Sequence, residues 1–499
     1  ENLQQALTLL RGLDKKVPAT VKHHALKDVA ISFLRLGEIE NCVTRCTCES
    51  CLLPIQAGGQ HEQQEGSRRA MDYLREALRG QFVDETELAG LQGLYGGLNL
   101  IQADYDNDGD LDILVLRGAW RGAAGRHPNS LLRNNGRAEF RDVTFDAGLG
   151  LVHYPTQNAA WADYDNDGQL DLFIGNENYP CQLFHNIGGG RFEDVAATAG
   201  VTNGEYTKGC SWGDYNGDGY PDLYVNNYGT PLRLDGQNNR NSSSQFFVAS
   251  RGAPNRLYRN NRDGTFTDVA AELQVTRPLK GFATWFWDVN NDGLLDIFAA
   301  SYDGTIADVA AEYLEKEQRA EDDCLYLNNG KGGFREVGYA WGMKRVTLAM
   351  GANFGDLNND GFDDVYLGTG APDYDSLVPN IMYLNRAGKS FTDITTNGGF
   401  GHLQKGHGVA FADLDNDGDQ DVVHVVGGAY PGDVAANVVF ENPGNQNHWV
   451  CIRLIGVTSN RSAIGAHLEL ELDDGAGNHR TIHKFIFMDI LVYRVLTYT

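Results

Sequence analysis

The sequence predicts a mainly β protein, a β-propeller of six or seven four-stranded blades, from three observations. A nine-residue acidic phrase occurs six times, and its copies begin 51 to 74 residues apart. Each copy is followed by a short apolar run and then by two further apolar stretches joined by Asn and Gly, which is typical of a β-hairpin. The chain also contains 60 glycines in 499 residues, which suits many tight turns. Four-stranded units repeated around an axis form a propeller.

Each repeat has the order strand, acidic loop, strand and hairpin. In the first unit the phrase Asp104–Asp112 reads Asp-Tyr-Asp-Asn-Asp-Gly-Asp-Leu-Asp, and the apolar run Ile113–Leu116 follows it. The hairpin is clearest in the third unit, where Leu257–Asn260 is followed by Gly264–Val269. Six such units are present, and whether C-terminal strands complete a seventh is open at this point.

The regions outside the repeats have other patterns. Residues 1–85 have helical periodicity and predict a small α-helical, TPR-like region. Residues 86–446 form the predicted propeller, and residues 447–499 return to alternating strands. Two insertions interrupt the repeats. Residues 226–254 are polar and predict a loop, whereas residues 306–322 predict a charged helix.

Each acidic phrase has the composition of a loop that binds a hard divalent cation. Positions 1, 3, 5 and 9 supply carboxylates or an Asn carbonyl, and calcium takes about six to eight oxygen ligands in a flexible shell. Position 7 varies, so only its backbone carbonyl is a common ligand, and glycine at position 6 permits the sharp turn. The expected ligands, in order along the chain, are Asp104, Asp106, Asp108, Asp110, Asp112, Asp163, Asp165, Asp167, Gln169, Asp171, Asp214, Asn216, Asp218, Tyr220, Asp222, Asp288, Asn290, Asp292, Leu294, Asp296, Asp356, Asn358, Asp360, Phe362, Asp364, Asp413, Asp415, Asp417, Asp419 and Asp421.

The spacing separates these loops from an EF-hand, which places a bidentate acid at position 12. Position 12 holds Val115 and Ile174 in the first two copies, and the closing acid is at position 9. A metal-free turn is the alternative for any single copy, because Asp, Asn and Gly favour turns. Six copies that all restore the acid at position 9 favour a metal. We therefore predict about six structural calcium ions per chain, which would change the formal net charge from −26 to −14.

The expected calcium affinity indicates where the protein is located, and the net charge indicates which partners it can bind. Extracellular modules bind calcium at ~10⁻⁴–10⁻³ M, and cytosolic calcium would leave such sites empty. We expect a secreted, extracellular or periplasmic protein. A net charge of −26 disfavours nucleic acid as a partner, and no apolar stretch is long enough to predict a membrane span.

The acidic loops resemble FG-GAP/VCBS repeats, which also form the calcium-binding blades of integrin α-chains. The segment 447–466, with Asn447-His-Trp-Val and Ser459-Asn-Arg-Ser-Ala-Ile-Gly-Ala, is similar to the ASPIC/UnbV domain. Together they resemble the cartilage acidic protein and UnbV-like family. The stretch from Glu40 to His61 looks like the helical N-terminal region of many bacterial members. The chain departs from the family after Arg480-Thr-Ile, where an apolar tail, 485–499, replaces the usual Gly-rich segment.

Four cysteines, Cys42, Cys46, Cys48 and Cys51, lie within ten residues of the N-terminal region, with His61 nearby. An oxidising compartment favours disulfides, and the family pattern implies a pair between Cys42 and Cys51. The alternative is a thiolate zinc or copper site, although the spacing is not a standard zinc pattern.

We interpret the protein as a secreted, calcium-stabilised module for binding or structure, with a protein or glycan ligand at the cell surface or matrix. The alternative is a secreted propeller enzyme, a hydrolase or metal-dependent catalyst. Gly209–Gly213 matches the G-x-S-x-G nucleophile motif around Ser211. It directly precedes an acidic loop, so we interpret it as the first strand of a blade and assign no catalytic residue. The β-prone tail 485–499 could add a strand to a second copy and build a homo-oligomer or fibre.

Overall fold

The computed structural model describes residues 86–229, 251–371, 377–427, 435–445, 447–473, 479–487 and 493–497. The chain divides into two compact units, Glu1–Gln92 and Gly93–Thr499. The second unit contains all the acidic phrases. The expected helical region 1–85 and its cysteine cluster lie outside the described residues.

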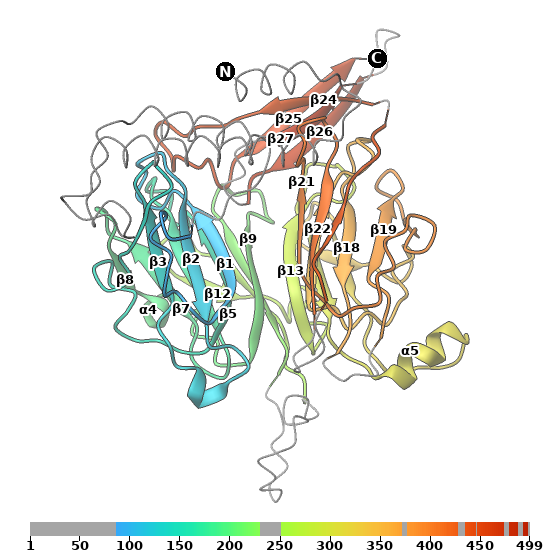
Figure 1. Ribbon diagram of the computed structural model, residues 1–499, viewed down its shortest axis with the longest axis horizontal. Coiled ribbons are helices and arrows are strands. Elements are labelled where there is room, and N and C mark those ends of the chain that lie inside the picture. The colour runs from blue at the N-terminus through green and yellow to red at the C-terminus, as the bar shows by residue number, and fades with distance from the viewer. Residues whose placement is uncertain are drawn as a thin grey trace, which may run out of the picture. The chain divides into compact units, whose positions relative to one another are not determined.

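Six antiparallel sheets make up the body of the second unit (Figure 1). Their strands are, for blade 1, β1 (Gly97–Ala103), β2 (Asp112–Arg117), β3 (Ser130–Asn134) and β4 (Phe140–Asp142); for blade 2, β5 (Thr156–Ala162), β6 (Asp171–Asn176), β7 (Gln182–Asn186) and β8 (Phe192–Asp194); for blade 3, β9 (Thr207–Gly213), β10 (Asp222–Asn227), β11 (Arg256–Asn260) and β12 (Phe266–Asp268); for blade 4, β13 (Gly281–Trp287), β14 (Asp296–Ser301), β15 (Cys324–Asn328) and β16 (Phe334–Glu336); for blade 5, β17 (Gly351–Gly355), β18 (Asp364–Gly368), β19 (Ile381–Asn385) and β20 (Phe391–Asp393); and for blade 6, β21 (Gly406–Ala412), β22 (Asp421–Val426) and β23 (Val438–Phe440).

The strand order confirms the predicted mainly β propeller. Each of the first five sheets follows the chain order of its four strands, and the sixth has three strands among the described residues. The first strands of neighbouring blades adjoin one another, as β5 does with β1 and β9. The number of blades, which the sequence left at six or seven, is six, because the C-terminal strands form two separate two-stranded sheets.

Apolar side chains join each blade to the next. Leu114 of blade 1 packs in one buried cluster with Trp161 of blade 2, and Leu183 of blade 2 does so with Trp212 of blade 3. Trp287 performs the same role between blades 4 and 5. Burial of such large side chains is the main favourable term in folding, so the blade interfaces hold the body of the protein together.

Among the described residues the helices are few and short. They are the 3₁₀ turn η3 (Gly122–Gly125), α4 (Ala196–Ala199) and α5 (Ile306–Tyr313). A capping box begins α5, since the Asp308 amide donates to the Thr305 hydroxyl and the Asp308 side chain accepts from the Thr305 amide. The helix predicted over 306–322 is therefore real but too long: it ends at Tyr313, and Glu315 has a left-handed φ of 53°.

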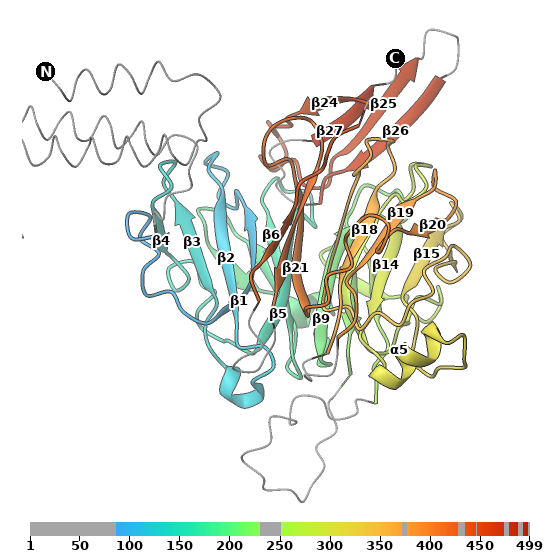
Figure 2. The ribbon, with the colours of Figure 1, turned by 45° about the vertical axis from the view of Figure 1, so that its right-hand side comes forward.

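The C-terminal strands lie beside the propeller loops in Figure 2. β24 (His448–Ile452) pairs with β27 (Tyr493–Thr497), and β25 (His467–Asp473) pairs with β26 (His479–Phe485), both antiparallel. In the part of the chain that the structure describes, no helix is long and apolar enough to cross a membrane.

Candidate calcium loops

The six acidic phrases occupy the same place in every blade, the connection between the first and second strands. The ninth residue of each phrase begins the second strand, as Asp112 begins β2 and Asp171 begins β6. Because the blades repeat one topology, the structure places all six loops at equivalent positions. The predicted ligands therefore come together in six local groups.

Two repeated hydrogen bonds give each loop its turn. The amide of the glycine at position 6 donates to the carboxylate at position 1 in all six loops, at 2.6 to 3.1 Å. The amide of position 7 donates to the carboxylate at position 5, at 2.8 to 3.0 Å. These position-6 glycines have φ between 82° and 109°, where a side chain would be strained.

The first two loops leave carboxylate oxygens buried and without a hydrogen-bond partner among the described residues. In the first loop they are Asp104 Oδ1, Asp106 Oδ1 and Asp112 Oδ2, and in the second loop Asp163 Oδ1. An unpaired buried carboxylate is costly, and oxygen atoms that converge without donors fit a hard cation. This donor set therefore fits calcium.

Acidic groups of three residues also form within single loops. Ligand oxygens lie within 4.8 Å of one another in Asp104, Asp106 and Asp108, and likewise in Asp163, Asp165 and Asp171. Loop 6 repeats the second arrangement with Asp413, Asp415 and Asp421. The carboxylates within each group repel one another unless a cation or protons neutralise their charge.

Burial changes the acidity of the closing carboxylates. It raises the pKa of Asp112 and of Asp222 to about 8, and that of Asp171 to about 7. The pKa of Asp104 rises to about 6 for the same reason. Each of these groups lies deeper than an ordinary surface acid, so a bound cation would stabilise its charged form.

Loops 3, 4 and 5 differ because asparagine holds position 3. Within the described residues these loops contain no group of three acids as close as those above. In loop 4 the Asn290 side chain donates to Asp292 at 2.9 Å, and the Asp292 amide donates to Asp288 at 3.0 Å. Each of these three loops therefore has one carboxylate fewer at positions 1, 3, 5 and 9.

Sequence reasoning missed an asparagine that ends the third strand of blades 1 to 5 and lies two residues after the third strand of blade 6. Its amide donates to the closing aspartate of its own loop, as Asn260 does to Asp222 at 2.8 Å. From blade 2 onward, its side chain also donates to a carbonyl in the loop of the preceding blade, as Asn260 does to Tyr164 at 2.8 Å. The residues equivalent to Asn260 are Asn186, Asn328, Asn385 and Asn442. This contact links consecutive acidic loops.

Position 4 of the phrase makes a second link, forward to the next blade. Asn107 donates to the Gly168 carbonyl at 3.0 Å, and Asn166 donates to the Gly219 carbonyl at 2.9 Å. Position 4 is not among the expected ligands. Its asparagine side chain contacts the neighbouring loop, so these loops form a connected series.

His185 is another neighbour of an acidic loop that the sequence did not single out. Its Nδ1 atom lies 3.1 Å from Asp171 Oδ1 and 3.5 Å from Asp165 Oδ2. The hydrogen bond to Asp171 raises the pKa of His185 to about 9. His185 lies in β7, in the blade 2 stretch that corresponds to Leu257–Asn260 of blade 3.

The C-terminal segment, residues 447–473 and 479–487, contacts several of the acidic loops. Arg480 donates to the Asp360 carbonyl at 2.6 Å, and Lys484 forms an ion pair with Asp363 at 2.6 Å. The Arg461 amide donates to the first loop at 2.8 Å. Basic side chains of this segment therefore lie among the acidic loops.

A cavity of about 490 Å³ lies between the loops and the C-terminal segment. Its lining includes Trp212 and Leu295 from the propeller and Ile464 and Phe485 from the segment. Apolar walls with polar groups nearby are typical of a ligand site.

Ser211 lies in the first strand of blade 3, as the sequence predicted. The residue lies in β9, is buried, and its Oγ accepts a hydrogen bond from the Phe286 amide at 3.2 Å. Cys181, Cys210 and Cys324 are free, buried thiols. Disulfides among Cys42, Cys46, Cys48 and Cys51 remain a prediction, because those residues lie outside the described part.

The fold and its loops define a class of protein: a six-bladed β-propeller with an acidic loop in every blade. The FG-GAP-like repeat family matches at residues 104–174, 163–225, 239–299, 288–367 and 370–424, and the FG-GAP repeat family at 211–244. Since these matches span more than half of the sequence, the chain belongs to the FG-GAP-like repeat family.

Individual relatives cover a smaller part of the chain. Human cartilage acidic protein 1 is 30% identical over 161 residues, which are 30% of this chain and 24% of that protein. The Xenopus tropicalis cartilage acidic protein 1 is 32% identical over 172 residues, 33% of this chain and 26% of its own. The similarity thus spans about a quarter of the length of these relatives.

Proposed function

We propose that this protein is a secreted propeller stabilised by about six calcium ions and acting as an extracellular module for binding or structure. The buried carboxylate oxygens without partners in the first loops carry the proposal. Similarity to proteins named for cartilage supports the extracellular location. We also propose three regions: helical 1–85, propeller 86–446 and ASPIC/UnbV-like 447–499.

The proposed ligands are the side chains at positions 1, 3, 5 and 9 of each phrase, with the backbone carbonyl at position 7. Oxygen donors of this kind suit calcium, which tolerates irregular shells. In each blade the ion would join the loop to the first residue of the second strand. The role we assign to calcium is therefore structural.

The cavity beside Trp212 and Phe485 is the proposed place for a ligand. A protein segment or a glycan fits its mixture of aromatic walls and polar loop groups. Ser211 is committed to a structural hydrogen bond. The enzyme alternative would gain support from substrate turnover that is lost on replacing a single acid outside the loops.

Self-assembly through the C-terminal strands belongs to the same proposal. β24 and β27 form a two-stranded sheet among the described residues, and a strand edge can pair with another chain. Light scattering of the chain without residues 493–499 tests this: a smaller particle supports assembly, and an unchanged one contradicts it.

Thermal unfolding with calcium or with a chelator tests the proposed function. At about ten times Kd, each calcium site would stabilise the fold by about 1.4 kcal/mol, so several sites give a large rise in Tm. Magnesium at the same concentration is the control, since it demands a stricter octahedral shell. Equal Tm values in calcium, magnesium and chelator would contradict the proposal.

A further inference from the structure

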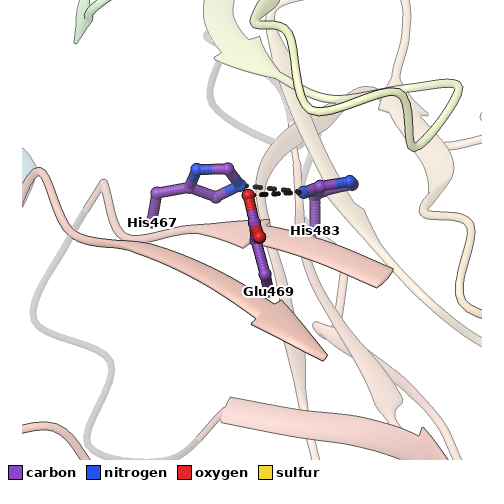
Figure 3. A group of neighbouring side chains, drawn as sticks. All are labelled: His467, Glu469 and His483. Carbon is purple, nitrogen blue, oxygen red and sulfur yellow. Dashed lines mark hydrogen bonds and ion pairs between the residues drawn. The ribbon is translucent and has the colours of Figure 1, made fainter. Parts of the chain in front are cut away.

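Two histidines and a glutamate meet on the hairpin of β25 and β26, away from the acidic phrases in sequence (Figure 3). Glu469 lies directly opposite His483 in the strand register, and His467 precedes Glu469 by two residues on the same face. His467 Nε2 is 3.0 Å from His483 Nδ1, which is 3.9 Å from Glu469 Oε1. One ligand atom from each of the three residues lies within 4.8 Å of the others.

Neighbouring contacts hold the His467 ring and the backbone of His483 in place. The His467 ring stacks on Phe485, with centroids 4.1 Å apart and planes at 6°. The His483 amide donates to Asn291 Oδ1 at 2.6 Å, which ties this part of β26 to the fourth acidic loop. The His467 ring and the strand that carries His483 are therefore ordered before any ion arrives.

The nitrogen atoms are spaced for a metal. Zinc binds imidazole nitrogen at about 2.0–2.1 Å in a tetrahedral shell, so two such nitrogens lie about 3.3 Å apart. The observed 3.0 Å is close to that value. Glu469 has a side chain that is 64% exposed, so its carboxylate is free to move the short distance that remains.

We propose that His467, Glu469 and His483 bind one transition-metal ion of the zinc class. Imidazole ligands favour such a metal over calcium, which prefers oxygen. Two histidines and one carboxylate leave a fourth position for water or for an anionic group of a ligand. His467 and Phe485 also line the 490 Å³ cavity, so the metal is at the edge of that cavity.

Zinc titration of the calcium-loaded full chain tests this site. The variants are His467→Ala and Glu469→Gln in β25, and the matched control is His479→Ala, an exposed histidine at the start of β26. We expect each site variant to bind one zinc equivalent fewer than the parent at about 10 µM free zinc, and the control to bind the same number. The difference between parent and variant is unaffected by zinc held at the N-terminal cysteines.

Cobalt substitution gives a second measurement. A four-coordinate Co²⁺ with nitrogen and oxygen ligands should produce visible absorption in the parent and control and lose it in both variants. Calcium content and Tm measured on every variant show that the fold is intact. Equal zinc binding by parent and site variants, or no binding by the parent, would overturn the proposal.

Discussion

At the residue scale, the ninth-position aspartate of the first acidic phrase combines two roles in one carboxylate. Asp112 Oδ1 accepts from the Asn134 amide at 2.8 Å, while Oδ2 is buried without a partner. The first oxygen therefore orders the loop, and the second is available to an ion. Substitutions that preserve shape but change charge can separate these roles.

Asp112→Asn should reduce the calcium content by about one ion per chain, because an amide nitrogen would replace a ligand oxygen. Asp110→Asn is the matched control, since position 7 is expected to bind only through its backbone carbonyl. Calcium per chain after gel filtration is the measurement. Equal losses in the two variants would contradict the assignment of ligands by position.

The same acids predict how pH acts on the metal-free protein. Burial raises the pKa of Asp112 and Asp222 to about 8 and that of Asp171 to about 7, whereas the unfolded chain has values near 3.9. The folded chain then holds more protons than the unfolded chain from about pH 4 to about pH 8, so its stability falls as pH rises through this window.

Tm measured in chelator at about pH 5 and about pH 8 tests this sign. We expect the lower Tm at the higher pH, and a loss of that difference when calcium replaces the protons. A Tm in chelator that increases with pH would mean that the acids are not held in a buried, neutral state.

At the element scale, the asparagines at the ends of the third strands connect neighbouring blades. Asn260 donates to the Tyr164 carbonyl at 2.8 Å and to the Pro221 carbonyl at 3.1 Å. Each buried carbonyl left unpaired costs about 1–3 kcal/mol. Strand β11 is therefore stabilised by a contact with the acidic loop of the preceding blade, outside its own sheet.

Asn260→Ala should lower the free energy of unfolding by about 2–4 kcal/mol, because a buried and a partly buried carbonyl lose their donor. Asn261→Ala, at an exposed neighbour, should change it by less than about 0.5 kcal/mol. Chemical unfolding in calcium measures both. A small effect of Asn260→Ala would show that the link between blades is dispensable.

The acidic loops and hairpins were predictable because their signals are local. Turn residues, alternating strands and the ninth-position acid all lie within a few residues of one another, and the structure has the predicted propeller. The link from Asn260 to Tyr164 crosses 96 residues, and nothing in a linear pattern specifies which blade faces which. The recurrence of asparagine in Leu257–Asn260 and its counterparts was the available signal.

Two other features could not be predicted from the sequence: the end of helix α5 and the pairing of His467 with His483. Helix α5 stops at Tyr313 because Glu315 takes a left-handed conformation, which composition alone did not reveal. The histidine pair on β25 and β26 forms only once the register of that hairpin is set. His467 and His483 lie 16 residues apart, so their spacing carried no metal pattern.

At the scale of the whole molecule, a buried ion pair joins four blades. Lys208 of β9 pairs with Glu177, which follows β6, and both side chains are fully buried. The Lys208 ammonium lies 3.1 Å from the ring centre of Trp120, after β2, and 5.5 Å from that of Phe282 in β13. Burial lowers the pKa of Lys208 to about 8.

Lys208→Met should destabilise the protein by about 3–5 kcal/mol, because Glu177 would keep its buried charge without a partner. Adding Glu177→Gln should recover part of this loss. Lys280→Met is the control, since its pair with Asp303 is partly exposed and such pairs contribute about 1 kcal/mol or less. Equal losses for Lys208→Met and Lys280→Met would contradict a central role for the buried pair.

We propose that each of the six acidic loops binds calcium. Elemental analysis of the native, unchelated protein tests it most directly. We predict about six calcium ions per chain, and one further zinc-class ion where that metal is available. A native protein that is folded and contains no calcium would contradict the account.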